Sequence, residues 1–141
     1  SIQKQSNGGS WVDDYPLGDV DIIPGDVFVI VHADVVDQTL IDEADLYGPP
    51  NIDTSPYGFG SPMNFNGNDP IGLYKNGVLI DIIGEEDNSK DHIHNKTWRR
   101  KASIKAPNTT FTESEWEILP SETLYQKEFI WLKSQLVNKQ L

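Results

Sequence analysis

The chain of 141 residues contains no cysteine. This absence excludes a disulfide framework, a thiolate zinc site and a cysteine nucleophile. No apolar run approaches the roughly 20 residues of a membrane-spanning helix, and no signal peptide or lipid anchor is visible. Positive charge is scarce, because 11 Lys and Arg face 22 Asp and Glu and leave a net charge of −11. Unaided binding to nucleic acid depends on basic side chains that neutralise phosphates, so we expect none.

Aromatic residues are abundant by contrast. The chain has four Trp, five Tyr and five Phe, which is too many for a disordered protein. Its length suits a single hydrophobic core, because such cores commonly occupy roughly 100–150 residues. We therefore predict one folded domain.

Hydrophobic patterning predicts two early elements. The Pro24-Gly25-Asp26 turn leads into the β-branched and aromatic run 27–31, which is typical of a strand in the interior of a sheet. After it, apolar residues return at helical spacing up to Ala44, and Asp34 is suited to cap the helix. The segment 1–20 is rich in Gly, Ser and Asp, and it predicts a loop lying against the core.

The strongest local signal is the Asn76-Gly77 pair between the apolar runs 71–75 and 78–83. Both residues accept positive φ, as the central positions of a type I′ turn require, so the pair predicts a β-hairpin. A further strand is predicted over 97–106, with Trp98 facing inward. From Ser121 onward, apolar residues recur every three to four positions and predict an amphipathic C-terminal helix. Short strands separated by Gly, Pro and Asn turns predict an all-β sandwich.

Four stretches together resemble one family, the bacterial lamin tail domain. They are GDVFVIVHA at 25–33, FNGNDPIGLYKNGVLIDIIG at 65–84, WRRKASIKAPNTTF at 98–111 and TESEWEILP at 112–120. The NGNDPIGLYKNG segment is the most specific piece, and the similarity covers roughly residues 7–124. The resemblance implies an immunoglobulin-like β-sandwich in a secreted or cell-surface bacterial protein. It brings no catalytic residues.

The resemblance divides the chain into a lamin-tail-like domain over 1–124 and a C-terminal helical extension over 125–141. The chain departs from the family pattern at both ends. The strand that opens the family pattern has no counterpart before SIQKQSNGGSW, and the family pattern finishes near Leu124. A missing strand would leave an unpaired sheet edge, and such edges recruit partners. We therefore expect another chain or the C-terminal segment to fill the edge.

Two motifs suggest metal ligands, and both have a simpler interpretation. His92 and His94 alternate and would share a strand face, but zinc needs three or four protein ligands, so exposed loop histidines are favoured. The Asn64, Asn66, Asn68 and Asp69 series resembles the oxygen ligands of a calcium loop. Because the remaining acidic ligand positions of such a loop are absent, ordinary Asx turns are favoured. Calcium is therefore the one cofactor that stays open.

Aromatic and basic residues supply the candidate contact surface. A Trp beside arginines can stack on a base or a sugar, although strand alternation favours a structural role for the Trp98–Lys101 cluster. The C-terminal helix presents either a core face or an interface. The candidate partner surface comprises Trp11, Tyr57, Trp98, Arg99, Arg100, Phe129 and Trp131.

The sequence contains no GxSxG, P-loop or HExxH motif, and we expect no enzyme activity. We expect a non-catalytic extracellular or cell-surface module that works through protein–protein contacts. Its partner is another protein, a neighbouring module, or a second copy bound through an open edge or the C-terminal helix. The alternatives are a carbohydrate- or nucleic-acid-binding module of a secreted enzyme, and a calcium-dependent adhesion domain.

Overall fold

The computed structural model describes residues 1–19, 27–48, 62–91, 94 and 96–120. Eight strands and one short α-helix are present in these residues. They are β1 (Ile2–Gln5), β2 (Trp11–Tyr15), β3 (Ile30–Val31), α1 (Gln38–Glu43), β4 (Leu46–Tyr47), β5 (Ile71–Lys75), β6 (Val78–Ile83), β7 (Lys96–Arg100) and β8 (Trp116–Pro120). The predicted β-rich architecture is confirmed.

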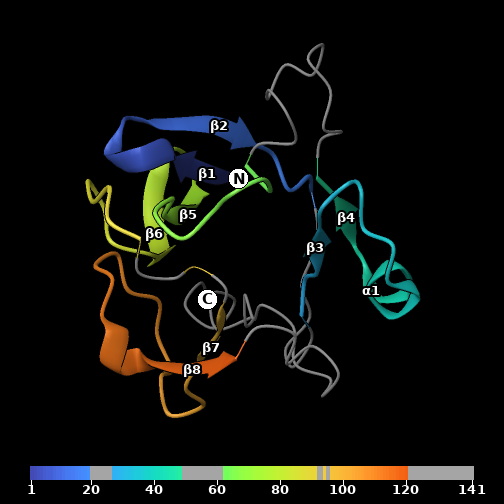
Figure 1. Ribbon diagram of the computed structural model, residues 1–141. Helices are drawn as coiled ribbons and strands as arrows, with labels where there is room; N and C mark the ends of the chain where they lie inside the picture. Colours follow the sequence, from blue (N-terminus) through green and yellow to red (C-terminus); the bar gives the residue numbers. More distant parts are fainter. Residues whose placement is uncertain (20–26, 49–61, 92–93, 95, 121–141) are drawn as a thin grey trace, which may run out of the picture.

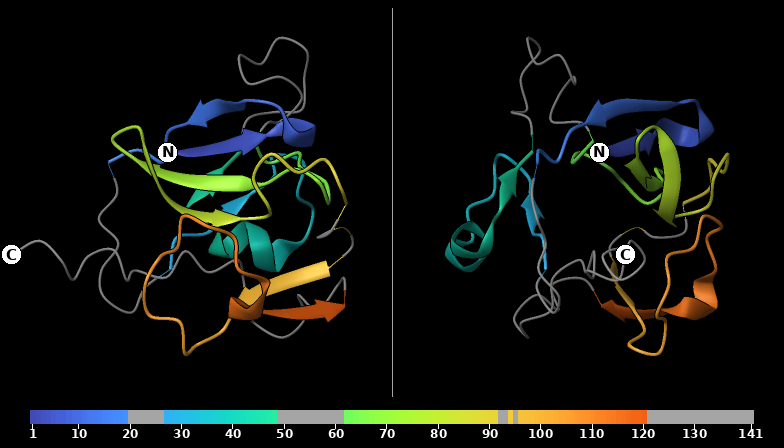
Figure 2. Two further views of the ribbon diagram at one scale, coloured as in Figure 1. Left: turned by 90° about the vertical axis from the view of Figure 1, so that its left-hand side faces the viewer. Right: turned by 180° about the vertical axis from the view of Figure 1, so that it is seen from behind.

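The strands form three sheets (Figure 1). A four-stranded antiparallel sheet has the order β2-β1-β5-β6, β7 and β8 form a second antiparallel pair, and β3 and β4 pair in parallel. Figure 1 and the view from behind in Figure 2 show α1 on the outer side of the β3–β4 pair. The buried apolar side chains come from all three sheets and from the residues before β3: Ile2, Phe28, Val29, Val31, Leu73, Ile82 and Trp98.

The predicted hairpin is confirmed. Strands β5 and β6 pair in antiparallel register from Ile71↔Ile83 to Lys75↔Val78. The turn residues Asn76 and Gly77 have φ values of 52° and 76°. These positive values explain why an Asn-Gly pair stands between the strands.

The predicted N-terminal loop is wrong. Residues 2–5 and 11–15 form β1 and β2, and β1 lies in the middle of the four-stranded sheet, between β2 and β5. Its polar side chains find distant partners: Lys4 Nζ donates to Asn64 Oδ1 (2.8 Å), and Gln5 Nε2 donates to Asp87 Oδ1 (2.7 Å). Both residues are buried. Hydrogen bonds of this kind remove most of the cost of burying polar groups.

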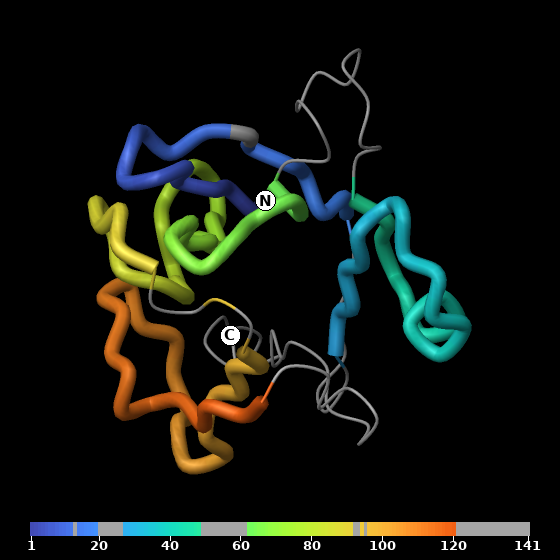
Figure 3. Tube along the Cα trace, in the orientation of Figure 1, coloured from blue at the N-terminus to red at the C-terminus, as the bar shows by residue number. Residues whose placement is uncertain are grey.

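The predicted strand over 27–31 is confirmed in its burial but is shorter than expected. Phe28, Val29 and Val31 are buried, and only Ile30 and Val31 pair with β4. The backbone of Val29 instead forms hydrogen bonds with Asp45. The Val29 N–H donates to Asp45 Oδ2 (2.7 Å), and the Val29 carbonyl accepts from the Asp45 N–H (2.9 Å). Figure 3 shows that residues 27–48 lie together on one side of the molecule. Helix α1 lies between β3 and β4 and forms part of the crossover connection that a parallel pair requires.

The predicted cap of this helix is also wrong. Asp37, not Asp34, is the N-cap of α1, and its side chain accepts from Thr39 N (2.9 Å) and Leu40 N (3.2 Å). Val36 therefore precedes the helix and is 91% exposed, and no residue of α1 is buried. The helix depends on its cap and its connections rather than on an apolar face.

This assignment predicts different effects for the two aspartates. Asp37→Ala removes the acceptor of two helix N–H groups, so we expect it to lower the free energy of unfolding by about 1 kcal/mol. Asp34→Ala is the matched control, because it removes the same charge three residues earlier without touching the cap. We expect a change within about 0.5 kcal/mol for it. Chemical denaturation of both variants measures the difference, and a larger loss for Asp34→Ala would contradict the assignment.

The strand predicted over 97–106 ends at Arg100. The Lys101 N–H still donates to the Glu115 carbonyl (2.8 Å), but Ile104 N then donates to Lys101 O (2.9 Å), which turns the chain away from β8. The predicted C-terminal helix and the turn at 24–26 lie outside the described residues. Among the residues that the structure does describe, no helix is long and apolar enough to cross a membrane.

Candidate functional site

The basic cluster of β7 lies at the centre of a structural network. Trp98 faces inward as predicted and is 7% exposed. Its ring packs against Phe111 (centroids 5.6 Å apart) and against Trp116 of β8 (6.4 Å). A ring buried in this way is not available to stack on a base or a sugar.

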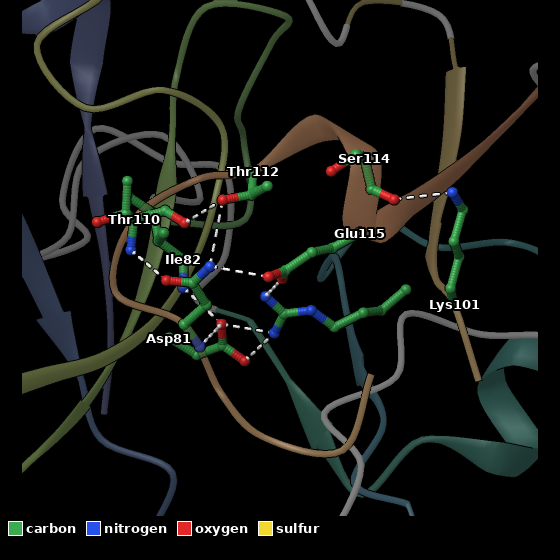
Figure 4. A network of polar contacts seen from close by, with 9 residues as sticks. Asp81, Ile82, Lys101, Thr110, Thr112, Ser114 and Glu115 are labelled. Atoms are coloured by element: carbon green, nitrogen blue, oxygen red, sulfur yellow. Dashed lines mark hydrogen bonds and ion pairs between the residues drawn. The ribbon is translucent and has the colours of Figure 1, made fainter. Parts of the chain in front are cut away.

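Arg100 joins two strands and a loop. Its Nη1 donates to Asp81 Oδ1 of β6 (2.6 Å), and its Nη2 donates to Glu115 Oε2 (2.7 Å), just before β8 (Figure 4). The three side chains are 13%, 19% and 18% exposed. The guanidinium also lies over the Trp116 ring, 4.9 Å from its centroid. Arg100 thus ties the four-stranded sheet to the β7–β8 pair.

Asn108 completes this network from the loop between β7 and β8. Its backbone N–H donates to Asp81 Oδ1 (3.1 Å), and its Nδ2 donates to Glu115 Oε1 (2.9 Å). The amide oxygen of Asn108 accepts from Thr110 N (2.9 Å). Asp81 and Glu115 therefore accept from several protein donors each, which is the arrangement expected of structural carboxylates.

Sequence reasoning did not single out this network. One local signal was present, because Asp81 is the only charged residue in the apolar run 78–83. A charge in such a run needs a partner, since an unpaired buried charge is costly. Nothing local indicated that the partner would be Arg100.

The other basic residues of the cluster are also engaged within the protein. Arg99 Nε donates to Glu117 Oε2 across the β7–β8 ladder (2.9 Å), and Lys101 Nζ donates to the Ser114 carbonyl (2.7 Å). The cluster therefore does not form a free basic surface. This arrangement weighs against binding of a nucleic acid or a sugar by the Trp98–Lys101 cluster.

Of the remaining candidate contact residues, the structure describes Trp11 alone. It lies in β2 and is partly exposed, and its Nε1 donates to Glu86 Oε1 (2.7 Å). Tyr57, Phe129 and Trp131 lie outside the described residues. The structure therefore separates Trp11 from Trp98, which belong to different sheets.

The Asn-rich loop before β5 forms the turns that the sequence favoured. Asp69 is buried, and its two carboxylate oxygens accept from Asn7 N (2.9 Å) and Asn66 N (3.1 Å). Asn66 Oδ1 accepts from Asn68 N, and Asn64 Oδ1 accepts from Lys4 Nζ. The bond between Asn68 N and Asn66 Oδ1 forms an Asx turn, and the other oxygens are occupied by more distant protein donors.

His94 pairs with Asp91 (3.4 Å), and both are exposed. His92 lies outside the described residues. In the part of the chain for which positions are given, no group of three or more His, Asp or Glu residues could hold a metal ion.

No family model, no curated protein and no solved structure matches this chain. The resemblance to lamin tail domains therefore stays a prediction that rests on the four stretches themselves.

The pKa of Tyr74 is raised from its ordinary value, first by burial and then by the negative charges of Glu86 and Asp14. A raised pKa means that the folded state favours the neutral phenol. Its contribution to stability is therefore complete below about pH 10 and is lost as the pH rises through the raised value. We expect Tyr74→Phe to lose less stability than the unaltered chain between neutral pH and pH values above about 10. Denaturant unfolding of both proteins across this range measures the difference, and parallel curves would contradict it.

Proposed function

We propose that this chain is a non-catalytic module of a secreted or cell-surface bacterial protein that works through contacts with another protein. The proposal includes an immunoglobulin-like β-sandwich related to the bacterial lamin tail domains. The β-rich fold is compatible with a sandwich, and the four resembling stretches favour this family.

The observation that carries the proposal is that the buried and largely buried charged side chains are bound to other groups of the protein. Arg100 pairs with both Asp81 and Glu115, and the three side chains connect two sheets. The buried Asp69 likewise accepts hydrogen bonds from the backbone N–H groups of Asn7 and Asn66. A catalytic acid or base must be able to exchange a proton with a substrate, whereas these groups hold the fold together.

Hydrolysis assays test the non-catalytic part. We expect the purified chain to show no turnover of chromogenic phosphodiesters, phosphate monoesters or glycosides. An activity that follows the protein through purification and disappears on a single substitution would overturn the proposal.

The solution mass, measured by light scattering over a concentration series, tests which protein is contacted. A stable dimer would assign the contact to a second copy, through an open sheet edge or the C-terminal segment. A monomer at all concentrations would assign it to a different protein.

A further inference from the structure

Two aromatic rings share one face of the four-stranded sheet. Trp11 of β2 reaches across β1 to Tyr74 of β5, and the ring centroids lie 5.7 Å apart at an interplanar angle of 71°. Both side chains are partly exposed. The exposed carboxylates of Asp14 and Glu86 lie beside them, and we call these four residues the Trp11–Tyr74 patch.

Gly72 makes room for these rings. A Cβ atom at this position would lie 2.8 Å from Tyr74 Cε2, 3.1 Å from Trp11 Cζ3 and 2.8 Å from Leu79 Cδ1. Glycine in the middle of a strand weakens the strand and often marks a place where another group approaches closely. Because Gly72 has no side chain, the Trp11 and Tyr74 rings can pack directly against the sheet.

The charges around the rings are negative. Glu86 accepts from Trp11 Nε1 (2.7 Å), and within the described residues it has no ion-pair partner. Asp14 accepts from Gln3 Nε2 (3.1 Å), and hydrogen bonds from Ser1 and Gln3 lower its pKa, so it is ionised at neutral pH. The Ser1 amino group is a positive charge near these rings, and it donates to the Tyr74 carbonyl (3.0 Å).

We propose that the Trp11–Tyr74 patch docks a Lys- or Arg-rich segment of a protein partner. An ammonium or guanidinium group is attracted to the faces of Trp and Tyr rings, and carboxylates beside the rings strengthen this attraction. A phosphate would be repelled by the same two carboxylates. The proposal names the partner chemistry of the module described above and rests on that proposed function.

The net charge of −11 acts in the same direction. A strongly acidic protein attracts basic partners over a distance, and the rings then supply the local contact. Lys75 does not oppose this, because successive residues of a strand point to opposite faces and Lys75 follows Tyr74.

Titration with a short oligolysine peptide tests the proposal, with the Trp11 indole N–H resonance as the local readout and calorimetry for the affinity. Trp11→Phe assigns the resonance. We expect this resonance to shift on binding, and Glu86→Gln to weaken binding about fivefold. Glutamine still offers an oxygen to Trp11 Nε1, so this variant should keep the fold.

Glu43→Gln is the matched control, because it removes the same charge from an exposed position on α1. We expect it to change the affinity less than about twofold. Equal losses of affinity for the two variants would show that binding depends on net charge alone, and would overturn the proposed site. A Trp11 resonance that stays in place with oligolysine, or that shifts with a neutral oligosaccharide instead, would also overturn it. None of these binding results bears on enzyme activity. The non-catalytic proposal is tested separately, by the hydrolysis assays.

Discussion

Replacing Arg100 by Met is expected to lower the free energy of unfolding by about 3 kcal/mol. The substitution leaves Asp81 and Glu115 without their cation, and both carboxylates are less than one-fifth exposed. Such groups cannot recover full hydration, so each retains an uncompensated charge in a poorly hydrated place. Urea denaturation, followed by tryptophan fluorescence, measures the loss.

The neighbouring ion pair supplies the control for Arg100. Arg99 and Glu117 also pair across β7 and β8, but their side chains are 30% and 42% exposed. Water can solvate both groups when one is removed, so we expect Arg99→Gln to cost less than about 1 kcal/mol. Equal effects at the two positions would show that the Asp81–Arg100–Glu115 network is not a main support of the fold.

Replacing Trp98 by Ala is expected to cost about 3–5 kcal/mol. The ring is buried between Phe111 and Trp116, and its removal leaves a large cavity in the contact between β7 and β8. Thermal and denaturant unfolding measure the effect. Val36→Ala is the control, because this side chain is 91% exposed, and a change within about 0.5 kcal/mol is expected.

A second substitution separates the ring volume from its polar group. The Trp98 Nε1 atom is buried and has no hydrogen-bond partner among the residues that the structure describes. Trp98→Phe therefore removes no hydrogen bond and also removes a polar group that burial penalises. We expect it to cost less than half of the loss caused by Trp98→Ala. A loss as large as that of the alanine variant would show that the indole N–H has a partner in solution.

The elements predicted correctly from the sequence are those with local causes. The β5–β6 hairpin follows from the conformational demands of its two turn residues, Asn76 and Gly77. The inward direction of Trp98 follows from strand alternation. In both cases the residues that decide the structure lie within a few positions of one another.

The N-terminal strand could not be predicted in this way. Ile2–Gln5 has one apolar residue, and the buried Lys4 and Gln5 are polar. Their burial depends on Asn64 and Asp87, which are distant in sequence. The hydrophobic pattern of a segment contains no information about such distant partners. The polar composition of residues 2–5 therefore favoured a loop.

The prediction of the helix N-cap was wrong by three residues, and the error has a physical reason. Asp34 and Asp37 are both suitable N-cap residues, and the choice between them depends on where the backbone leaves β3. The contacts of the candidate site were hidden for a similar reason. The basic residues of β7 are obvious in the sequence, but their acidic partners come from β6, from β8 and from the turn just before β8.

The central place of β1 has a consequence for how the chain acquires its structure during synthesis. β1 and β2 leave the ribosome before β5, but a two-stranded pair is at best marginally stable alone. The other neighbour of β1 is β5, which starts at Ile71, and the buried Gln5 waits still longer for Asp87. Pairings between such distant residues form slowly, because the intervening chain must first be brought together. The nascent segment 1–15 therefore stays open to chaperones and proteases until β5 and Asp87 have been made.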